Sequence, residues 1–201
     1  MTIFYKKLNL ELDTDDWRFL NYLSHTYLSN VEALNSPANI NQHKEYYTKP
    51  ISGKIGQYKY YSIRKSNNDY SDRNIFKKIA NLFKPGSNLN SFDVIYNSSQ
   101  LSFVGDNLVP HKDKRKCAIT IPLTTITSPI SWYKATSPEL SEQIGLSDRN
   151  TYSELASYDY GCTATIINTS IFHGTPDNIS PRIFFQISID NDIETAVDSL
   201  I

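Results

Sequence analysis

The segment VPHKDKRKCAITIPL, Val109–Leu123, joins a pair of polar side chains to a strand-like apolar run. His111 and Asp113 are separated by a single residue, Lys112. Successive side chains of an extended chain alternate between faces, so both can face one cavity while Lys112 points away. The run AITIPL is apolar at both sets of alternating positions, which is typical of a strand covered on both faces. The segment therefore predicts a layered β-fold with a candidate polar site at the mouth of a strand.

Short strand-like runs separated by turn residues continue on either side of this segment, through residues 91–190. They are SFDVIYNSS, QLSFVG, LVPHKD, KCAITIPLT, ISWYKA, GCTATIINT and RIFFQISID. About seven short strands in roughly one hundred residues indicate a sandwich or a barrel and not a series of βαβ units.

The first ninety residues have a mixed helix and strand pattern. Apolar spacing and capping residues predict a helix over residues 14–34 and another within SDRNIFKKIANLFKPGSN, and IGQYKYYSIRK predicts a strand near residues 56–64. We expect residues 1–201 to form a single domain, with residues 1–90 as a support region and 91–190 as the β-core. The N-terminal helices would cover the strands that are apolar on both faces.

Composition limits the classes of function. The net charge is -1, the pI is about 6.4, hydrophobic residues make up 39% and charged residues 20%, as in a folded protein. With a net charge this close to zero, the protein has no overall electrostatic field that would attract it to nucleic acid or to an anionic membrane. No apolar run reaches the length of a membrane span. The opening MTIFYKKLNLELDTDDW lacks a signal-peptide pattern, so we expect a cytoplasmic protein. Cys117 and Cys162 lie in apolar runs and are expected to be buried free thiols. The oligomeric state has no readable signal.

A single His-x-Asp is often only a hydrogen-bonded surface pair, but two further residues argue for a site. His173 follows an apolar strand and precedes a turn marked by Gly174, and Arg182 opens the final apolar strand. An arginine in that position needs an anion, because an unpaired buried charge is costly. Two imidazoles and one carboxylate form the facial triad that holds non-haem Fe(II) and leaves open positions.

In their order and spacing, these residues resemble the Fe(II)- and 2-oxoglutarate-dependent oxygenases. The resemblance covers about residues 91–190. The sequences that flank these residues are HKDKRKCAITIPL and INTSIFHGTPDNISPRIFFQIS. They are most similar to the prolyl-hydroxylase-like and aspartyl/asparaginyl-hydroxylase-like branches of the family, including uncharacterised viral and bacterial members. It implies a mainly β (α+β) double-stranded β-helix, a cupin-like jelly roll, with supporting N-terminal helices. It also implies iron held by His111, Asp113 and His173, and 2-oxoglutarate bound between the iron and Arg182.

The activity implied by the resemblance is hydroxylation of a C–H bond by dioxygen, with decarboxylation of 2-oxoglutarate to succinate and with ascorbate as a supporting reductant. The substrate would be a peptidyl residue of a peptide or protein, or a small amino-acid-like molecule. Members near the aspartyl/asparaginyl type often lack the metal-binding carboxylate, whereas this chain keeps Asp113. The retained carboxylate also disfavours halogenation, for which that residue is replaced by a small one.

Other residues have two interpretations each. Thr120 is either a hydrogen-bond donor to the co-substrate or an ordinary strand threonine, and Arg115 either supports the site and co-substrate or lies in a solvated turn. Trp132, Tyr133 and Tyr96 either line a substrate pocket or belong to the core. The polar insert at about residues 134–158 forms either a lid or a plain surface excursion.

Two other functions remain open from the sequence. One is a non-catalytic jelly-roll binding or structural module whose His/Asp cluster is incidental or holds a structural metal. The other is a cupin metalloenzyme that does not use 2-oxoglutarate. Arg182 discriminates between these and the oxygenase, because only the oxygenase gives it a role.

Overall fold

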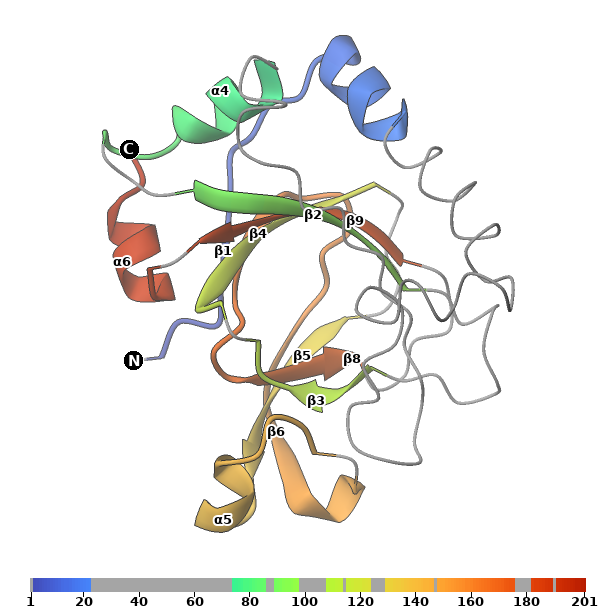
Figure 1. The fold of residues 1–201 in the computed structure, drawn as a ribbon, viewed down its shortest axis with the longest axis vertical. Coiled ribbons are helices and arrows are strands. Elements are labelled where there is room, and N and C mark those ends of the chain that lie inside the picture. The colour runs from blue at the N-terminus through green and yellow to red at the C-terminus, as the bar shows by residue number, and fades with distance from the viewer. Residues whose placement is uncertain are drawn as a thin grey trace, which may run out of the picture.

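The computed structural model describes residues 2–22, 74–85, 89–97, 108–113, 115–123, 129–146, 148–175, 182–189 and 191–201. Two antiparallel β-sheets form the centre of this part of the chain, and short helices lie around them (Figure 1). The predicted strand near 56–64, the run QLSFVG and the second half of the predicted helix at 14–34 lie outside the described residues. The prediction of a mainly β fold with supporting helices is confirmed.

The larger sheet has five strands and the smaller has four. In spatial order, the larger contains β1 (Tyr5–Lys7), β7 (Thr165–Asn168), β4 (Cys117–Pro122), β9 (Arg182–Ile189) and β2 (Leu89–Asn97). The smaller contains β3 (Leu108–His111), β8 (Phe172–Thr175), β5 (Ile130–Ala135) and β6 (Tyr152–Tyr158). Every pairing between these strands is antiparallel.

The strands from β2 to β9 pair from the outside inward. β2 pairs with β9, β3 with β8, β4 with β7 and β5 with β6, and successive pairs alternate between the two sheets. This is the pattern of one long antiparallel hairpin rolled on itself. This pairing places β3 beside β8, and it therefore brings together His111 and His173, which are more than sixty residues apart in the sequence.

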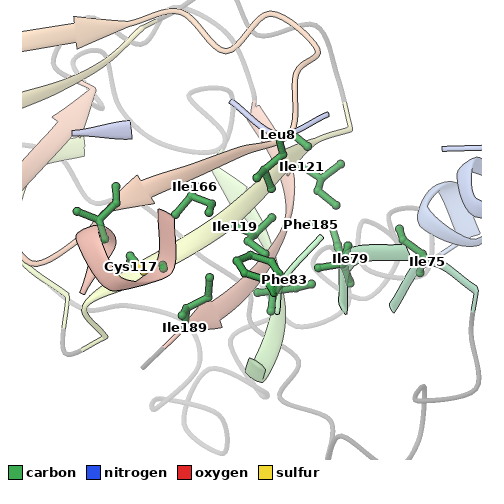
Figure 2. Packing of buried hydrophobic residues seen from close by; sticks show 14 of the residues in the cluster. Leu8, Ile75, Ile79, Phe83, Cys117, Ile119, Ile121, Ile166, Phe185 and Ile189 are labelled. Carbon is green, nitrogen blue, oxygen red and sulfur yellow. The ribbon is translucent and has the colours of Figure 1, made fainter. Parts of the chain in front are cut away.

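Helices cover the outer face of the five-stranded sheet. They are the helix at residues 14–22, α4 (Asn74–Ala80) and α6 (Ile193–Asp198), while α5 (Pro138–Ser141) and the short 3-10 turn η1 (Arg149–Thr151) lie near β5 and β6 (Figure 1). Ile75 and Ile79 of α4 pack in one cluster with Ile119 of β4 and Phe185 of β9 (Figure 2). The Phe76 ring of α4 meets the Phe185 ring edge-on at 5.8 Å between centroids.

The alternation along β4 and β9 explains why both runs are apolar throughout. Ile119 and Phe185 face the helices, whereas Ala118 and Phe184 pack between the sheets with Trp132 of β5. Burying both faces removes the polar positions that would give an exposed strand its period of two. The expectation that helices and a second sheet cover these strands is confirmed.

Three corrections concern local structure. Cys117 is a buried free thiol as predicted, but Cys162 is exposed, because it follows Gly161 in a turn (φ 52°) and does not lie in a strand. The insert at 134–158 contains the end of β5, α5, η1 and all of β6, so its last part is an edge strand of the smaller sheet. β1 and β8 are short and β6 is mostly exposed, and the sequence patterns did not predict any of the three as a separate strand.

An ion-pair cluster joins the N-terminal helix to α4. The Asp13 carboxylate accepts from the backbone N–H of Asp16, and that of Asp16 accepts from the N–H of Asp13 in return, which caps the helix. The Lys78 ammonium of α4 donates to both carboxylates, at 2.7 Å and 2.5 Å. These hydrogen bonds hold the pKa of Asp13 below its ordinary 3.8, at about 2, with the Lys78 bond as the largest cause.

We expect this cluster to make stability sensitive to acid. Because the folded-state pKa of Asp13 is depressed, its contribution is present above pH 4 and is lost as the pH falls from about 4 to about 2. Lys78→Met should lower the midpoint of urea unfolding at pH 7 and should reduce its loss between pH 4 and pH 2. Lys77→Met, on the exposed side of the same helix, is the control and should leave both quantities unchanged. Equal behaviour of the two variants would contradict the role of the cluster.

Candidate metal centre

Two buried histidines face each other across neighbouring strands of the smaller sheet. His111 ends β3 and pairs in register with His173 of β8, and their ring centroids are 4.4 Å apart. Both are buried. His173 in turn lies opposite Trp132 of β5, which packs between the sheets, so the two imidazoles also face the space between the sheets.

Asp113 completes the group just beyond the end of β3. Its backbone N–H donates to the carbonyl of Thr169 at 2.9 Å, and its Oδ1 lies 3.6 Å from Nε2 of His111. One potential ligand atom from each of His111, Asp113 and His173 lies within 4.8 Å of the others. Within the described residues, these three form the one cluster of histidine, cysteine and acidic side chains that could hold a metal ion. The structure thus brings together the three residues that the sequence predicted.

The hydrogen bonding of His173 leaves a nitrogen available for a metal. Its Nδ1 lies 2.9 Å from the carbonyl oxygen of Ile171. A carbonyl oxygen can only accept, so we assign the proton to Nδ1 and the lone pair to Nε2. Orientation of a ligating histidine by a backbone carbonyl on its other nitrogen is the usual arrangement at metal sites.

The charges favour deprotonated ligands. Burial raises the pKa of Asp113, but the positive charge of Arg115, the electrostatic effects of His173 and His111 and the hydrogen bond from Arg115 outweigh burial and lower it to about 2. Burial is the main cause that lowers the pKa of His173 to about 4, and His111 lowers it further, against the opposing effect of Asp113. At pH 7 the site therefore offers an ionised carboxylate and a neutral imidazole from His173, the forms that bind a metal.

Lys112, between the two ligand candidates, points away from them as predicted. Its Nζ lies 4.4 Å from the centroid of the Phe172 ring and donates to the carbonyl of Ser141, and its backbone N–H donates to Ile144 at 2.8 Å. Leu146 donates back to Pro110 at 2.8 Å. These contacts fasten the segment after α5 along β3. The described part of the insert is thus held against the strand that carries the candidate ligands.

The predicted pocket residues are divided between the two faces of β5. Trp132 shares the face of His173, and its indole Nε1 donates to the carbonyl of Asn168 at 2.8 Å. Tyr133 lies on the opposite face, opposite Phe172 in register and in a cluster with Ala135. The structure therefore places Tyr133 in the outer core, away from the histidines, because adjacent residues of a strand point to opposite sides.

A polar pair lies on the larger sheet, on the face turned toward the smaller one. Thr120 of β4 and Gln186 of β9 pair in register, and they alternate with residues that face the helices, as Ala118 and Phe184 do. Gln186 Nε2 donates to Thr120 Oγ1 at 3.1 Å, and both side chains are buried. Gln186 Oε1 has no hydrogen-bond partner among the described residues. A buried amide oxygen without a hydrogen-bond partner destabilises the folded protein by about 1–3 kcal/mol. A bound ligand that donates to this oxygen, or a rotated Gln186 amide, would remove that destabilisation.

The remaining predicted residues are placed only in part. Arg115 lies beside the cluster, where its Nε donates to Oδ2 of Asp113 at 2.8 Å. Arg182 opens β9 with its backbone paired to Asn97, and Tyr96 lies in β2, but the side chains of Arg182 and Tyr96 are outside the described part of the structure. Thr169, whose carbonyl holds Asp113, was not among the predicted site residues, because no residue pattern marks a backbone contact of that kind.

No protein-family model matches the chain, and no curated protein matches it in sequence. Solved structures do match. The crystal structure of AviO1 from Streptomyces viridochromogenes Tue57 has a TM-score of 0.55 and 13% identity, over 94% of this chain and 90% of that one. SnoN, a non-heme alpha ketoglutarate dependent epimerase from nogalamycin biosynthesis, has a TM-score of 0.51 and 13% identity, over 92% and 78%. The chain has the fold of these two proteins.

Among the described residues, no helix is long and apolar enough to cross a membrane.

Proposed function

We propose that the chain is an Fe(II)- and 2-oxoglutarate-dependent oxygenase. The observation that carries this proposal is the convergence of His111, Asp113 and His173 in the space between two rolled sheets. The order of pairing from β2 to β9 fits a double-stranded β-helix, and the shared fold with SnoN, itself alpha-ketoglutarate-dependent, supports the same class. Likeness of fold alone does not assign a function, so the site chemistry is the main support.

The residues fit a ferrous ion. Two imidazoles and one carboxylate match the ligand set of non-haem iron oxygenases, and His173 already presents an unprotonated Nε2. When bound, iron with 2-oxoglutarate and dioxygen supplies the oxidising power that attacks a substrate C–H bond, and 2-oxoglutarate becomes succinate and CO2. The protein would supply ligation, orientation and exclusion of water. Burial of both histidines and of Trp132 beside them provides the last of these.

The direct test is a spectroscopic titration. Anaerobic addition of Fe(II) and 2-oxoglutarate to the purified protein should produce the weak visible charge-transfer band of the iron–keto-acid chelate. His173→Ala should not produce the band. Absence of the band in the wild-type protein, with Fe(II) shown to bind, would contradict the proposal and would favour a cupin metalloenzyme that does not use 2-oxoglutarate. Absence of any metal binding would favour a non-catalytic module.

We propose that the 2-oxoglutarate site includes Arg182 and the polar pair of Thr120 and Gln186. The far carboxylate of the co-substrate would pair with the Arg182 guanidinium, which can bind it through two hydrogen bonds. Thr120 and Gln186 are buried and face the space that also contains the histidines. Rotation of the Gln186 amide would let the Thr120 hydroxyl donate to its oxygen and would turn its N–H groups toward a carboxylate.

This assignment predicts a loss of affinity when the polar pair is made apolar. Thr120→Val and Gln186→Leu should each raise the KM for 2-oxoglutarate, by roughly 5- to 50-fold if one or two hydrogen bonds to an ion are lost. Steady-state succinate release at varied 2-oxoglutarate measures the change. The matched control is Ser131→Ala, which removes a buried hydroxyl of β5 that bonds to Ser157. A control effect as large as that of Thr120→Val would show that the pair acts only on folding.

The substrate proposed is a peptidyl residue or a small amino-acid-like molecule, in keeping with the resemblance to prolyl and aspartyl/asparaginyl hydroxylases. Succinate release against a panel of peptides and free amino acids would identify it. Mass spectrometry of the product decides the reaction type, because hydroxylation adds one oxygen atom whereas an epimerisation, the reaction in the name of SnoN, leaves the mass unchanged. We expect the added oxygen.

A further inference from the structure

The two oxygens of the Asp113 carboxylate have different environments. Oδ1 faces the imidazoles, 3.6 Å from Nε2 of His111, whereas Oδ2 accepts a hydrogen bond from Nε of Arg115 at 2.8 Å. The side chains of both residues are largely buried, with relative exposures of 22% for Asp113 and 19% for Arg115. One oxygen is therefore directed toward the candidate metal position while the other is held by a cation.

The backbone around this pair is also fixed. The Thr169 carbonyl accepts from the backbone N–H of Asp113 at 2.9 Å, and the Thr169 hydroxyl donates to the backbone carbonyl of Arg115 at 2.9 Å. Thr169 itself is fully buried. One residue after β7 thus anchors the backbone of both Asp113 and Arg115. The side-chain contact closes a network that leaves the carboxylate little freedom to rotate.

We infer that Arg115 is a positioning residue that keeps Asp113 a one-oxygen ligand to the metal. A carboxylate can bind a metal through one oxygen or through both, and binding through both would fill a position that the co-substrate or dioxygen needs. A charge-assisted hydrogen bond to Oδ2 opposes that second mode and orients Oδ1. This inference rests on the proposed function, and it adds a reason for an arginine two residues after the ligand.

Side-chain geometry allows a matched set of variants. Counted along the side chain, Nε2 of glutamine occupies the same place as Nε of arginine, so Arg115→Gln keeps an N–H donor at that point and removes the charge. Arg115→Met keeps a chain of similar length without either donor or charge. Lys116→Gln removes a positive charge from the adjacent exposed residue and serves as the control for charge alone.

The test uses Co(II) as a visible probe of the metal site in the full-length protein. The absorption spectrum of bound Co(II) reports the number and arrangement of its ligands, and a second titration with 2-oxoglutarate measures co-substrate affinity. We expect Arg115→Met to change the Co(II) spectrum and to lower 2-oxoglutarate affinity roughly 10-fold or more. Arg115→Gln and Lys116→Gln should both keep the wild-type spectrum.

Two results would overturn the inference. One is an Arg115→Met protein with the wild-type spectrum and wild-type affinity. The other is a change in Arg115→Gln as large as in Arg115→Met, which would mean that the charge and not the hydrogen bond matters. Should Arg115→Met fail to fold by circular dichroism, Arg115→Leu replaces it, because leucine also lacks both the donor and the charge. A wild-type spectrum and affinity in Arg115→Leu would then overturn the inference, and altered values would support it.

Failure of the proposed function would be visible separately. If the wild-type Co(II) complex does not respond to 2-oxoglutarate, the oxygenase proposal fails. The comparison of Co(II) spectra among the Arg115 variants still decides whether this residue sets the binding mode of Asp113.

Discussion

Replacing His173 with alanine should abolish both Fe(II) binding at the site and succinate formation. The residue is almost fully buried, and its Nδ1 bond to the Ile171 carbonyl already aims Nε2 for ligation. Loss of one of three protein ligands leaves an incomplete set that holds ferrous iron weakly. His111→Ala and Asp113→Ala should have the same result. Metal content after dialysis against Fe(II) and succinate release with 2-oxoglutarate in excess measure the two effects.

A suitable control is Asp15→Ala, which removes an exposed carboxylate far along the chain from the site. Circular dichroism and thermal unfolding establish that each variant is folded. Turnover near the wild-type level in Asp113→Ala would show that this carboxylate is not a ligand, and the iron-oxygenase proposal would then fail. A chelator should remove activity from the wild-type protein, and added Fe(II) should restore it.

Replacing Arg182 with alanine should raise the KM for 2-oxoglutarate by roughly 100-fold and leave kcat much less affected at saturation. The expected size follows from losing two charge-assisted hydrogen bonds to a carboxylate, at about 1.5–3 kcal/mol each and with partial compensation by water. A contact made equally in the ground state and the transition state changes KM and not kcat. Initial rates of succinate release over a range of 2-oxoglutarate concentrations separate the two constants.

Arg182→Lys should recover only part of the affinity, because an ammonium lacks the two-pronged geometry of a guanidinium. Arg149→Ala, at an exposed arginine of η1, is the control and should leave KM unchanged. An unchanged KM in Arg182→Ala would remove the reason for preferring an oxygenase over a cupin enzyme that does not use 2-oxoglutarate.

Some features of the site follow from local sequence because they depend on short-range geometry. His111 and Asp113 are two residues apart at the end of a strand, so strand alternation alone places them on one side and Lys112 on the other. The apolar runs of β4 and β9 were recognisable as strands covered on both faces. The position of Cys162 was predicted wrongly, because the run GCTATIINT begins with a turn at Gly161 and the strand starts only at Thr165.

Other features depend on which strands become neighbours, and local patterns carry no such information. Tyr133 could line a pocket as well as Trp132 until the pairing of β5 with β8 showed which of them shares the face of His173. β6 reads as a polar surface segment because it is an edge strand with mostly exposed side chains. Gln186 became a candidate for the co-substrate site only when its pairing with Thr120 and its unpaired oxygen were visible.

The sequence by itself determined the chemical types of the candidate ligands, their order along the chain and the mainly β character of the fold, since these depend on residue identity and on a period of two. Tertiary structure decided that His173 lies against His111, because only the rolled pairing of β3 with β8 joins residues so far apart. It also decided how the Asp113 carboxylate is oriented. That orientation comes from a guanidinium and a backbone carbonyl of Thr169 that meet only when β4 and β7 pair.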